Sequence, residues 1–373
     1  MQQITILIKP ASGICNAVCE YCFYEDTMRH RKQINHGYMS DLEIEAILKN
    51  TLAVKKYERV LFYFQGGEPL VVGIDFYEKF IDKAKRLQQH VEVEYAIQTN
   101  GILLDEAYCK LFKKNNFLVG ISLDGIKKTN DSHRFLANKA TGSFDTVLKK
   151  IELLEKYNIS YNILSVLSKK LALHAQEIYA FYRKKDFKYI QFIPCLPSID
   201  NGLDDLYSCT PQLYKNFYTV IFKQWLKDLK KGQYISIRLF EDILLMFNKQ
   251  KPMQCGMLGK CQKQCIIESD GSVYPCDFYV LDEYMIGNIK EKSIDDLMND
   301  TLVNEFIDDR KCNLLCEKCK FKNICNGGCR RQRITFLDET YCGMKEIFEL
   351  FYTNYKTIHK YLRTITQNER DDL

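Results

Sequence analysis

The sequence lacks any apolar run of about eighteen residues, the shortest length typical of a membrane-spanning helix. Its first residues, Met1-Gln-Gln-Ile-Thr-Ile, lack the basic and then apolar segments of a signal peptide. It also lacks internal repeats and low-complexity tracts. With 46% hydrophobic and 27% charged residues, the composition is that of a globular protein, and we expect no association with a membrane.

Sixteen cysteines without a secretory signal favour metal binding over disulfides, and they indicate a reducing, cytoplasmic location. The formal charge of +5 does not by itself predict nucleic-acid binding. Lysine pairs such as Lys55-Lys56 and Lys169-Lys170 do not form a continuous basic stripe, and bound metal clusters would offset the positive charge. We therefore expect no nucleic-acid partner.

The length of 373 residues allows one large domain and a smaller one. In residues 1–235, short apolar segments alternate with longer amphipathic ones. The strand candidates are Ile4–Ile8, Val60–Phe64, Val93–Ile97, Phe117–Leu123, Ser160–Leu167 and Tyr189–Ile193. The helix candidates are Asp41–Ala53, Asp75–Gln89, Asp105–Lys113, Ser143–Tyr157 and His174–Lys185. Six alternations of strand and helix predict an α/β fold with a parallel sheet. Six strands are too few to close an eight-stranded barrel. We expect a partial (β/α)6 barrel.

Residues 236–373 are predicted to form a second, cysteine-rich domain. A long helix, about Pro211–Lys230, precedes it, and short segments follow from Cys255 onward. Asp270-Gly271 is typical of a hairpin turn. We expect a final amphipathic helix over Lys345–Leu362 and a polar, frayed end over Arg363–Leu373.

Three cysteines near the start, Cys15, Cys19 and Cys22, follow the first predicted strand with the spacing Cys-x3-Cys-x2-Cys. Three thiolates on one loop can hold three irons of a 4Fe–4S cube and leave the fourth iron open for chemistry. The alternative is a structural zinc site, with His30 or a distant residue as the fourth ligand.

The segment Cys15-Asn-Ala-Val-Cys19-Glu-Tyr21-Cys22, with Phe23-Tyr24 after it, resembles the cluster loop of radical S-adenosylmethionine (SAM) enzymes. The resemblance implies that SAM chelates the open iron. An electron from the cluster then cleaves SAM to methionine and a 5′-deoxyadenosyl radical, which abstracts hydrogen from carbon. It also implies that Tyr21 belongs to the cofactor-binding region.

Gly66-Gly67-Glu68-Pro69 directly follows the second predicted strand. Glycines let the backbone approach a ligand closely, and a glutamate can accept hydrogen bonds from an ammonium group, although such a segment is also a common turn. It resembles the radical SAM motif that holds the methionyl amino group. The same resemblance assigns Ser122 and Arg134 to the ribose and carboxylate of SAM, and Cys195 to the region that packs the adenine.

A second cysteine series begins with Cys261-x9-Gly271-x4-Cys276 and continues with Cys-x2-Cys-x5-Cys-x3-Cys from Cys316, then Cys342. It resembles the SPASM extension, which carries auxiliary iron–sulfur clusters. A zinc ribbon is the alternative for the Cys316 segment, but the partner spacing fits poorly. The family pattern implies one 4Fe–4S cluster held by Cys255, Cys261, Cys276 and Cys329. It implies another held by Cys316, Cys319, Cys325 and Cys342.

Five cysteines then remain, namely Cys109, Cys195, Cys209, Cys265 and Cys312. We expect Cys109 to be a buried apolar residue of a helix. Cys265 and Cys312 lie close enough in sequence to the assigned ligands to leave the assignment open by one residue.

The chain as a whole resembles anaerobic sulfatase-maturating enzymes. The resembling stretches are Leu7-Ile-Lys-Pro-Ala-Ser12, Cys22-Phe-Tyr24, Phe64-Gln-Gly-Gly-Glu-Pro69, Ser272-Val-Tyr-Pro-Cys-Asp-Phe-Tyr279 and Gly327-Gly-Cys-Arg-Arg331. The resemblance implies oxidation of a cysteine or serine in a sulfatase polypeptide to Cα-formylglycine. It implies three 4Fe–4S clusters, SAM and a low-potential electron donor such as ferredoxin or flavodoxin.

Asp277 occupies the position that the family uses as catalytic base. A carboxylate next to the predicted ligand Cys276 would place a base close to an electron sink, which suits the loss of a proton and an electron from a substrate radical. The alternative is a strand-end residue that bonds its own backbone.

Two other functions stay open from the sequence. One is a radical SAM maturase of a ribosomally made peptide, which forms thioether or carbon–carbon crosslinks. The other is a non-catalytic iron–sulfur or zinc protein that binds a partner.

Overall fold

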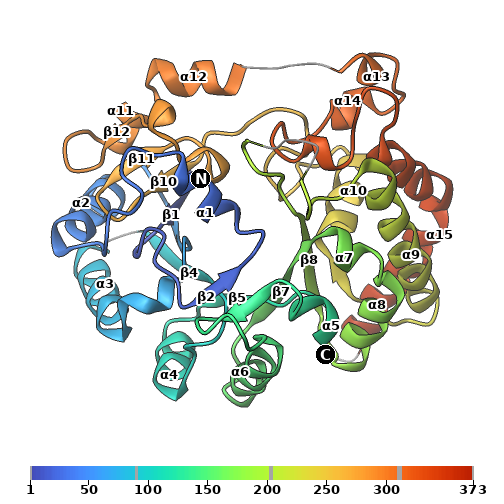
Figure 1. Ribbon diagram of the computed structural model, residues 1–373, viewed down its shortest axis with the longest axis horizontal. Helices are drawn as coiled ribbons and strands as arrows, with labels where there is room; N and C mark the ends of the chain where they lie inside the picture. The colour runs from blue at the N-terminus through green and yellow to red at the C-terminus, as the bar shows by residue number, and fades with distance from the viewer. Residues whose placement is uncertain (1, 89–90, 201–204, 309–312, 372–373) are drawn as a thin grey trace. The chain divides into compact units, whose positions relative to one another are not determined.

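The computed structural model of the chain describes residues 2–88, 91–200, 205–308 and 313–371 (Figure 1). The chain divides into two compact units. The first unit consists of Met1–Leu123, Asp131–Asn162 and Gln262–Asp309. The second consists of Asp124–Asn130, Ile163–Cys261 and Arg310–Leu373.

The first unit is built on a mostly parallel sheet. Its neighbouring parallel strands are β10 (Cys265–Ile267), β1 (Gln3–Ile8), β3 (Arg59–Phe64), β4 (Glu92–Thr99) and β5 (Leu118–Ser122). β11 (Ser272–Tyr274) and β12 (Gly287–Asn288) extend the β10 edge in antiparallel fashion. β2 (Ala17–Cys19) and β6 (Arg134–Leu136) form a separate antiparallel pair.

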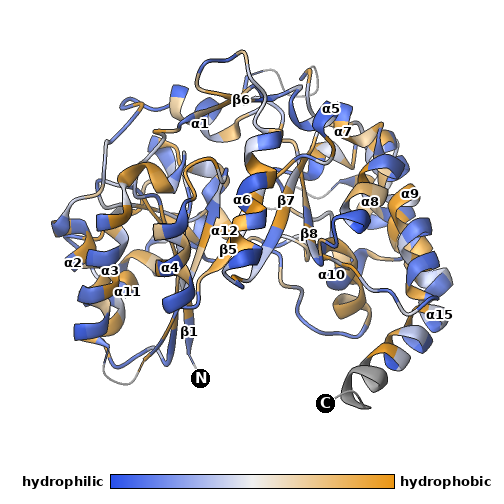
Figure 2. Cartoon of the chain, turned by 90° about the horizontal axis from the view of Figure 1, so that it is seen from below, coloured by the Kyte–Doolittle hydropathy of each residue, from blue (hydrophilic) through white to orange (hydrophobic). Residues whose placement is uncertain are grey.

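The helices of the first unit lie between its strands along the chain or, in the case of α11 and α12, after β12. They are α1 (Phe23–Arg29), α2 (Asp41–Leu52), α3 (Ile74–Leu87), α4 (Glu106–Lys114), α6 (Phe144–Lys156), α11 (Ile294–Met298) and α12 (Thr301–Asp308). Short 3-10 turns are η1 (Pro69–Val72), η3 (Asp277–Tyr279) and η4 (Asp282–Tyr284). Helices α3, α4 and α6 combine hydrophobic with hydrophilic residues, as helices covering a sheet require (Figure 2).

The second unit contains the strands β7 (Tyr161–Leu167, from its third residue onward), β8 (Tyr189–Pro194) and β9 (Ser236–Ile237), which run parallel. Its helices are α5 (Lys127–Asn130), α7 (Lys169–Ala172), α8 (Ala175–Lys184), α9 (Pro211–Leu229), α10 (Arg238–Phe247), α13 (Leu314–Glu317), α14 (Lys322–Cys325) and α15 (Gly343–Asp371), with the turn η5 (Arg333–Thr335). The long helices α9 and α15 pack against each other.

Aromatic side chains fill both cores. In the first unit, Phe64 stacks with Phe117 and meets Phe80 edge to face. In the second unit, Trp225 and Phe240 lie against Phe351 of α15, and all three are buried. Such aromatic burial supplies a large share of the hydrophobic stabilisation and fixes the strands that carry the site residues.

The strand and helix predictions for residues 1–235 are confirmed within one or two residues at the described ends. The capping box that starts α2 is present, since Leu42 N donates to Ser40 Oγ and Ser40 N donates to Glu43. The hairpin at Asp270-Gly271 joins β10 to β11, as predicted. None of the helices that the structure describes has the length and apolar content to cross a lipid bilayer.

The predicted helix end at Leu362 is wrong, because α15 continues to Asp371. Fraying of the last residues stays a prediction. The tail contains no glycine or proline, and its Arg, Gln and Glu residues favour helix, so nothing local terminates α15. Residues 262–309 belong to the first compact unit. The predicted division into 1–235 and 236–373 stays a prediction about sequence modules.

Candidate active site

The cysteine triplet lies on the loop that follows β1. Cys19 ends β2 and pairs with Arg134 of β6, while Cys22 is the residue directly before α1 and makes no side-chain capping hydrogen bond. Asn100 Nδ2 lies 3.7 Å from Cys15 Sγ, and Arg134 Nη1 lies 3.8 Å from Cys19 Sγ. Such donors stabilise thiolates and cluster sulfurs.

The thiols of the triplet influence one another electrostatically. The pKa of Cys15 is raised to about 12. The main cause is loss of solvation of the thiol, and the negative charges of Glu68, Cys19 and Cys22 contribute to the rise. A cation at this loop would reverse the effect, because metal ligation deprotonates thiols. The donor set of three closely spaced thiols therefore fits a cube with one iron left open.

The Gly66-Gly67-Glu68 segment is docked onto this loop. Gly67 N donates to Ser12 O at 2.8 Å, and Glu68 N donates to Ile14 O at 2.8 Å. A Cβ atom at position 67 would lie 2.3 Å from Ile14 O, so only glycine permits this approach. The glycines thus connect the end of β3 to the cysteine loop.

Glu68 is buried and held by three donors. It accepts hydrogen bonds from Thr99 Oγ1 at 2.7 Å, Asn100 N at 2.7 Å and Leu70 N at 3.0 Å. Burial raises the pKa of Glu68 to about 7, and these hydrogen bonds oppose the rise. An ammonium group beside Glu68 would stabilise its carboxylate. Thr99 ends the adjacent strand β4 and Asn100 follows it, and the sequence reasoning did not assign them to the site.

The other predicted SAM residues are distributed over both units. Arg134 lies over the Tyr21 ring, 5.5 Å from its centroid, so both lie at the cysteine loop. Ser122 ends β5 and accepts a hydrogen bond from Gln98 Nε2 at 3.1 Å. Cys195 follows β8 in the second unit and is buried. Binding of SAM by these residues stays a prediction.

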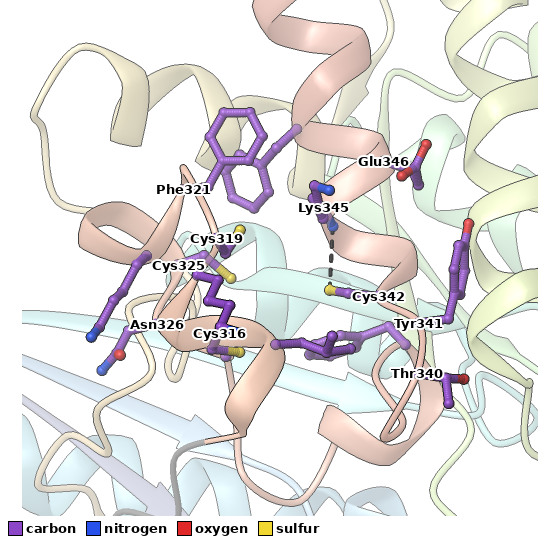
Figure 3. Close-up of a pocket in the computed structure, with 16 residues that line it drawn as sticks. Cys316, Cys319, Phe321, Cys325, Asn326, Thr340, Tyr341, Cys342, Lys345 and Glu346 are labelled. Atoms are coloured by element: carbon purple, nitrogen blue, oxygen red, sulfur yellow. Dashed lines mark hydrogen bonds between the residues drawn. The ribbon is translucent and has the colours of Figure 1, made fainter.

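Four thiols of the second unit surround one cavity of about 250 Å³ (Figure 3). They belong to Cys316, Cys319, Cys325 and Cys342. Burial raises the pKa of Cys325 to about 12, and the other three thiolates contribute to the rise. Lys345 N donates to Cys342 Sγ at 3.4 Å. Across the described residues, no group of three or more Cys, His, Asp or Glu side chains is arranged around a single metal ion.

The all-thiol donor set around a cavity of this size fits a fully ligated 4Fe–4S cluster. The other predicted set divides between the units. Cys255, Cys261 and Cys329 belong to the second unit and Cys276 to the first. Within the second unit, the segment of Cys255 approaches Cys329 closely, because a Cβ at Gly256 would lie 2.7 Å from Cys329 Cβ. Assignment of these four residues to one cluster stays a prediction.

The cysteines outside the three predicted ligand sets have different environments. Cys265 is buried in β10 and pairs with Ile6 of β1, and burial raises its pKa to about 12. Cys109 is buried in α4, as predicted. Cys312 lies outside the described residues.

Asp277 begins η3, directly after Cys276, and its carboxylate is held from two sides. Lys9 Nζ lies 2.6 Å from Asp277 Oδ1, and Gln65 Nε2 donates to Oδ2 at 2.6 Å. Lys9 and Gln65 follow the adjacent parallel strands β1 and β3. The sequence reasoning missed both residues, although each stands in a quoted family stretch immediately after a strand.

Comparison with known families identifies the class. The profile of the radical SAM superfamily matches residues 10–179, and that of an iron–sulfur cluster-binding domain, SPASM, matches residues 255–320. The fold and site therefore define a radical SAM enzyme with a SPASM domain and an α/β, mostly parallel sheet, as predicted. SAM, a 4Fe–4S cluster and auxiliary clusters are its cofactors.

Individual relatives narrow the class. The chain is 44% identical, over 89% of both sequences, to the cysteine-type anaerobic sulfatase-maturating enzyme of Clostridium novyi. It is 29% identical, over 96% of this chain and 90% of the relative, to the serine-type enzyme of Bacteroides thetaiotaomicron. A solved structure of native anSMEcpe with bound AdoMet and Kp18Cys peptide matches 98% of this chain and 100% of that chain, with TM-score 0.87 and 34% identity. The chain belongs to the family of anaerobic sulfatase-maturating enzymes.

Proposed function

We propose that this enzyme oxidises a cysteine of a sulfatase polypeptide to Cα-formylglycine. The observation that carries the proposal is the 44% identity to a cysteine-type relative, against 29% to a serine-type relative. Serine is the alternative target. It has the same Cβ hydrogens as cysteine and differs only in carrying a hydroxyl in place of the thiol. The peptide that accompanies AdoMet in the similar solved structure supports a polypeptide substrate for this chain.

The cofactors are assigned to the residues that fit them. Cys15, Cys19 and Cys22 would hold the first cluster, and Glu68 would accept hydrogen bonds from the amino group of SAM. When bound, these groups supply a 5′-deoxyadenosyl radical, and the auxiliary clusters supply a destination for one electron from the substrate. Tyr21, Gly66, Gly67, Ser122, Arg134 and Cys195 would complete the SAM site.

The role of Asp277 is to accept a proton. A cysteine that loses a Cβ hydrogen atom to the deoxyadenosyl radical must also lose its thiol proton and one electron to become a thioaldehyde. Water then hydrolyses the thioaldehyde to the aldehyde and releases hydrogen sulfide. Asp277 suits the proton transfer because its carboxylate is oriented by Lys9 and Gln65 and its side chain is still 14% exposed.

The proposal includes a location and an electron source. The first cluster needs a low-potential donor such as ferredoxin or flavodoxin, and the cytoplasm supplies both the reducing conditions and such donors. Auxiliary clusters held by Cys255, Cys261, Cys276 and Cys329, and by Cys316, Cys319, Cys325 and Cys342, would bring the total to three.

The test is mass spectrometry of two sulfatase peptides that differ only in a target cysteine or serine. Each is incubated anaerobically with reconstituted enzyme, SAM and reductant. We expect formylglycine from the cysteine peptide and at least about tenfold less from the serine peptide, by analogy with discrimination at a site built for one substrate group. The enzyme in which Cys15, Cys19 and Cys22 are all replaced by Ala is the negative control. Faster conversion of serine would reject the cysteine assignment, and SAM cleavage without any aldehyde would reject the function.

A further inference from the structure

The structure assigns a function to Lys9 that goes beyond the base itself: we propose that Lys9 is the residue that positions Asp277 for proton transfer. The inference rests on the proposed function, because it concerns the proton that the substrate thiol loses. It predicts that loss of the Lys9 ammonium uncouples aldehyde formation from SAM cleavage.

The two contacts to Asp277 leave its carboxylate little freedom to rotate. Lys9 Nζ lies 2.6 Å from Oδ1, and Gln65 Nε2 lies 2.6 Å from Oδ2. Each oxygen therefore has its own partner, an ion pair at Oδ1 and a hydrogen bond at Oδ2, and a partial rotation of the carboxylate about the Cβ–Cγ bond would lengthen both contacts. A base must be oriented in this way to accept a proton along a hydrogen bond from the substrate.

Backbone hydrogen bonds of the sheet hold Lys9 and Gln65, the two partners of the Asp277 carboxylate, in place. Lys9 N donates to Ile267 O at 2.8 Å, and Gln65 N donates to Ile8 O at 2.9 Å. A Cβ atom at Gly66 would lie 3.2 Å from Lys9 Cβ, so the glycine leaves room for the lysine stem. The sheet therefore determines where the ammonium stands.

The burial of Lys9 makes a purely stabilising role a poor explanation. The Lys9 side chain has 0% exposure, and its ammonium lies 4.0 Å from the centroid of the Tyr24 ring. An ion pair whose cation is fully buried adds little net stability, because desolvation offsets the attraction, and an apolar pair of similar volume often serves as well. A buried lysine at a strand end beside the base therefore points to function.

A second buried ion pair holds the surroundings of Lys9 in place. Arg31 Nη1 lies 3.0 Å from Glu268 Oε1, and the side chains of both residues have 0% exposure. The Tyr24 hydroxyl also donates to Glu268. The Tyr24 ring against which Lys9 lies is thus anchored at its other end. The two pairs contain two cations and two carboxylates, so removal of Lys9 alone unbalances the charge around Asp277.

The test substitutes Lys9 by Met, which retains the length of the stem and removes the charge. Deoxyadenosine and formylglycine are measured in the same anaerobic reaction with a cysteine sulfatase peptide, together with iron content. We expect the deoxyadenosine produced per aldehyde to rise about tenfold, part of the 10²–10⁴-fold effect of a general base. The matched control is Lys79→Met, which removes a lysine from the exposed pair with Asp41 and should leave the ratio unchanged.

A second variant addresses the case in which Lys9→Met folds poorly. Lys9→Ala creates space for a small alkylammonium ion, and added ethylammonium should lower the ratio of deoxyadenosine to aldehyde again. Ethanol at the same concentration fills the space without charge and should leave the ratio high. Rescue by both compounds equally would indicate that volume matters and would overturn the positioning role.

The outcomes distinguish this inference from the function on which it rests. A Lys9→Met enzyme that makes both products in the unaltered ratio, even in lower amounts, would overturn the role of Lys9 and leave the proposed function intact. Absence of formylglycine from the unaltered enzyme would reject the proposed function, and the role of Lys9 with it.

Discussion

The cysteine loop of the first unit and the four-thiol cavity of the second differ in ligand number and in surroundings. The loop offers three thiols, with Arg134, Asn100 and the carboxylate Glu68 close by. The cavity offers four thiols and is lined by aromatic residues such as Phe321 and Phe348 together with charged ones such as Lys345 and Glu346. As with zinc, an incomplete ligand set suits chemistry, whereas a complete set suits a structural or electron-transfer role.

The substitution with the largest expected effect removes the open site altogether. Replacement of Cys15, Cys19 and Cys22 by Ala should abolish SAM cleavage and leave about eight of about twelve irons, the content of two 4Fe–4S clusters. Iron analysis and chromatography of deoxyadenosine check this. The Cys109→Ala enzyme is the control, because Cys109 is buried in α4 and belongs to none of the three predicted ligand sets, and it should retain all iron. Continued formation of deoxyadenosine by the triple variant would contradict the assignment of the loop.

The next effect separates the base from the cluster loop. Asp277→Asn should lower formylglycine formation by about 10²–10⁴-fold, because the amide is no base, while SAM cleavage continues. Both products are measured in one reaction. A near-normal aldehyde yield would demote Asp277 to a structural residue.

The ion pair between Lys9 and Asp277 means that Asp277→Asn should also change the stability of the protein. Asp277→Asn leaves the buried ammonium of Lys9 without a counter-charge, and removing one partner of a buried pair typically costs about 3–5 kcal/mol of unfolding free energy. Denaturation should therefore find the double variant Lys9→Met/Asp277→Asn more stable than Asp277→Asn alone, although both lack aldehyde formation. Equal stabilities of the two variants would argue against an energetically coupled pair.

A smaller effect is expected at Glu68. Glu68→Gln keeps the size and hydrogen-bond acceptor but removes the charge that would face the amino group of SAM. We expect the KM for SAM to rise about tenfold or more, since hydrogen bonds to charged groups contribute about 1.5–3 kcal/mol. Iron content should not change. An unaltered KM would remove Glu68 from the SAM site.

The smallest effect on SAM cleavage is expected at the four thiols of the second-unit cavity. Cys342→Ala should lose iron and unfolding free energy together, because cluster binding is coupled to folding, while deoxyadenosine formation continues. Cys265→Ala is the matched control, since Cys265 is a buried residue of β10 and should retain iron. Equal loss of iron from both variants would require a new ligand assignment.

Local sequence patterns predicted most of the fold. Alternation of apolar segments located six of the eight parallel strands that the structure describes, because their buried residues form short continuous runs. The two short strands β9 and β10 were not predicted. Ser40 and Glu43 marked the start of α2 through hydrogen bonds within one helical turn. The end of α15 was missed, because a polar helical tail and a frayed tail have similar composition.

The candidate site was less predictable where it depends on distant contacts. The cysteine loop and Glu68 lie in short motifs, and their closeness follows from adjacent parallel strands. Lys9 and Gln65 also lie in stretches that resemble the family, but no local pattern indicated their contact with Asp277, because only the strand register and the return of the chain at Cys276 bring them together. The pairing of β2 with β6, which faces Arg134 toward Cys19, depends on a contact between segments more than a hundred residues apart.

Transfer of an isotope from the substrate tests the central claim most directly. A sulfatase peptide whose target cysteine carries deuterium in place of both Cβ hydrogens is incubated with the reconstituted enzyme, SAM and reductant. The account predicts deoxyadenosine that contains one deuterium, together with formylglycine that retains the other, in amounts close to one per aldehyde. Formylglycine accompanied by unlabelled deoxyadenosine would contradict abstraction of the Cβ hydrogen by the deoxyadenosyl radical.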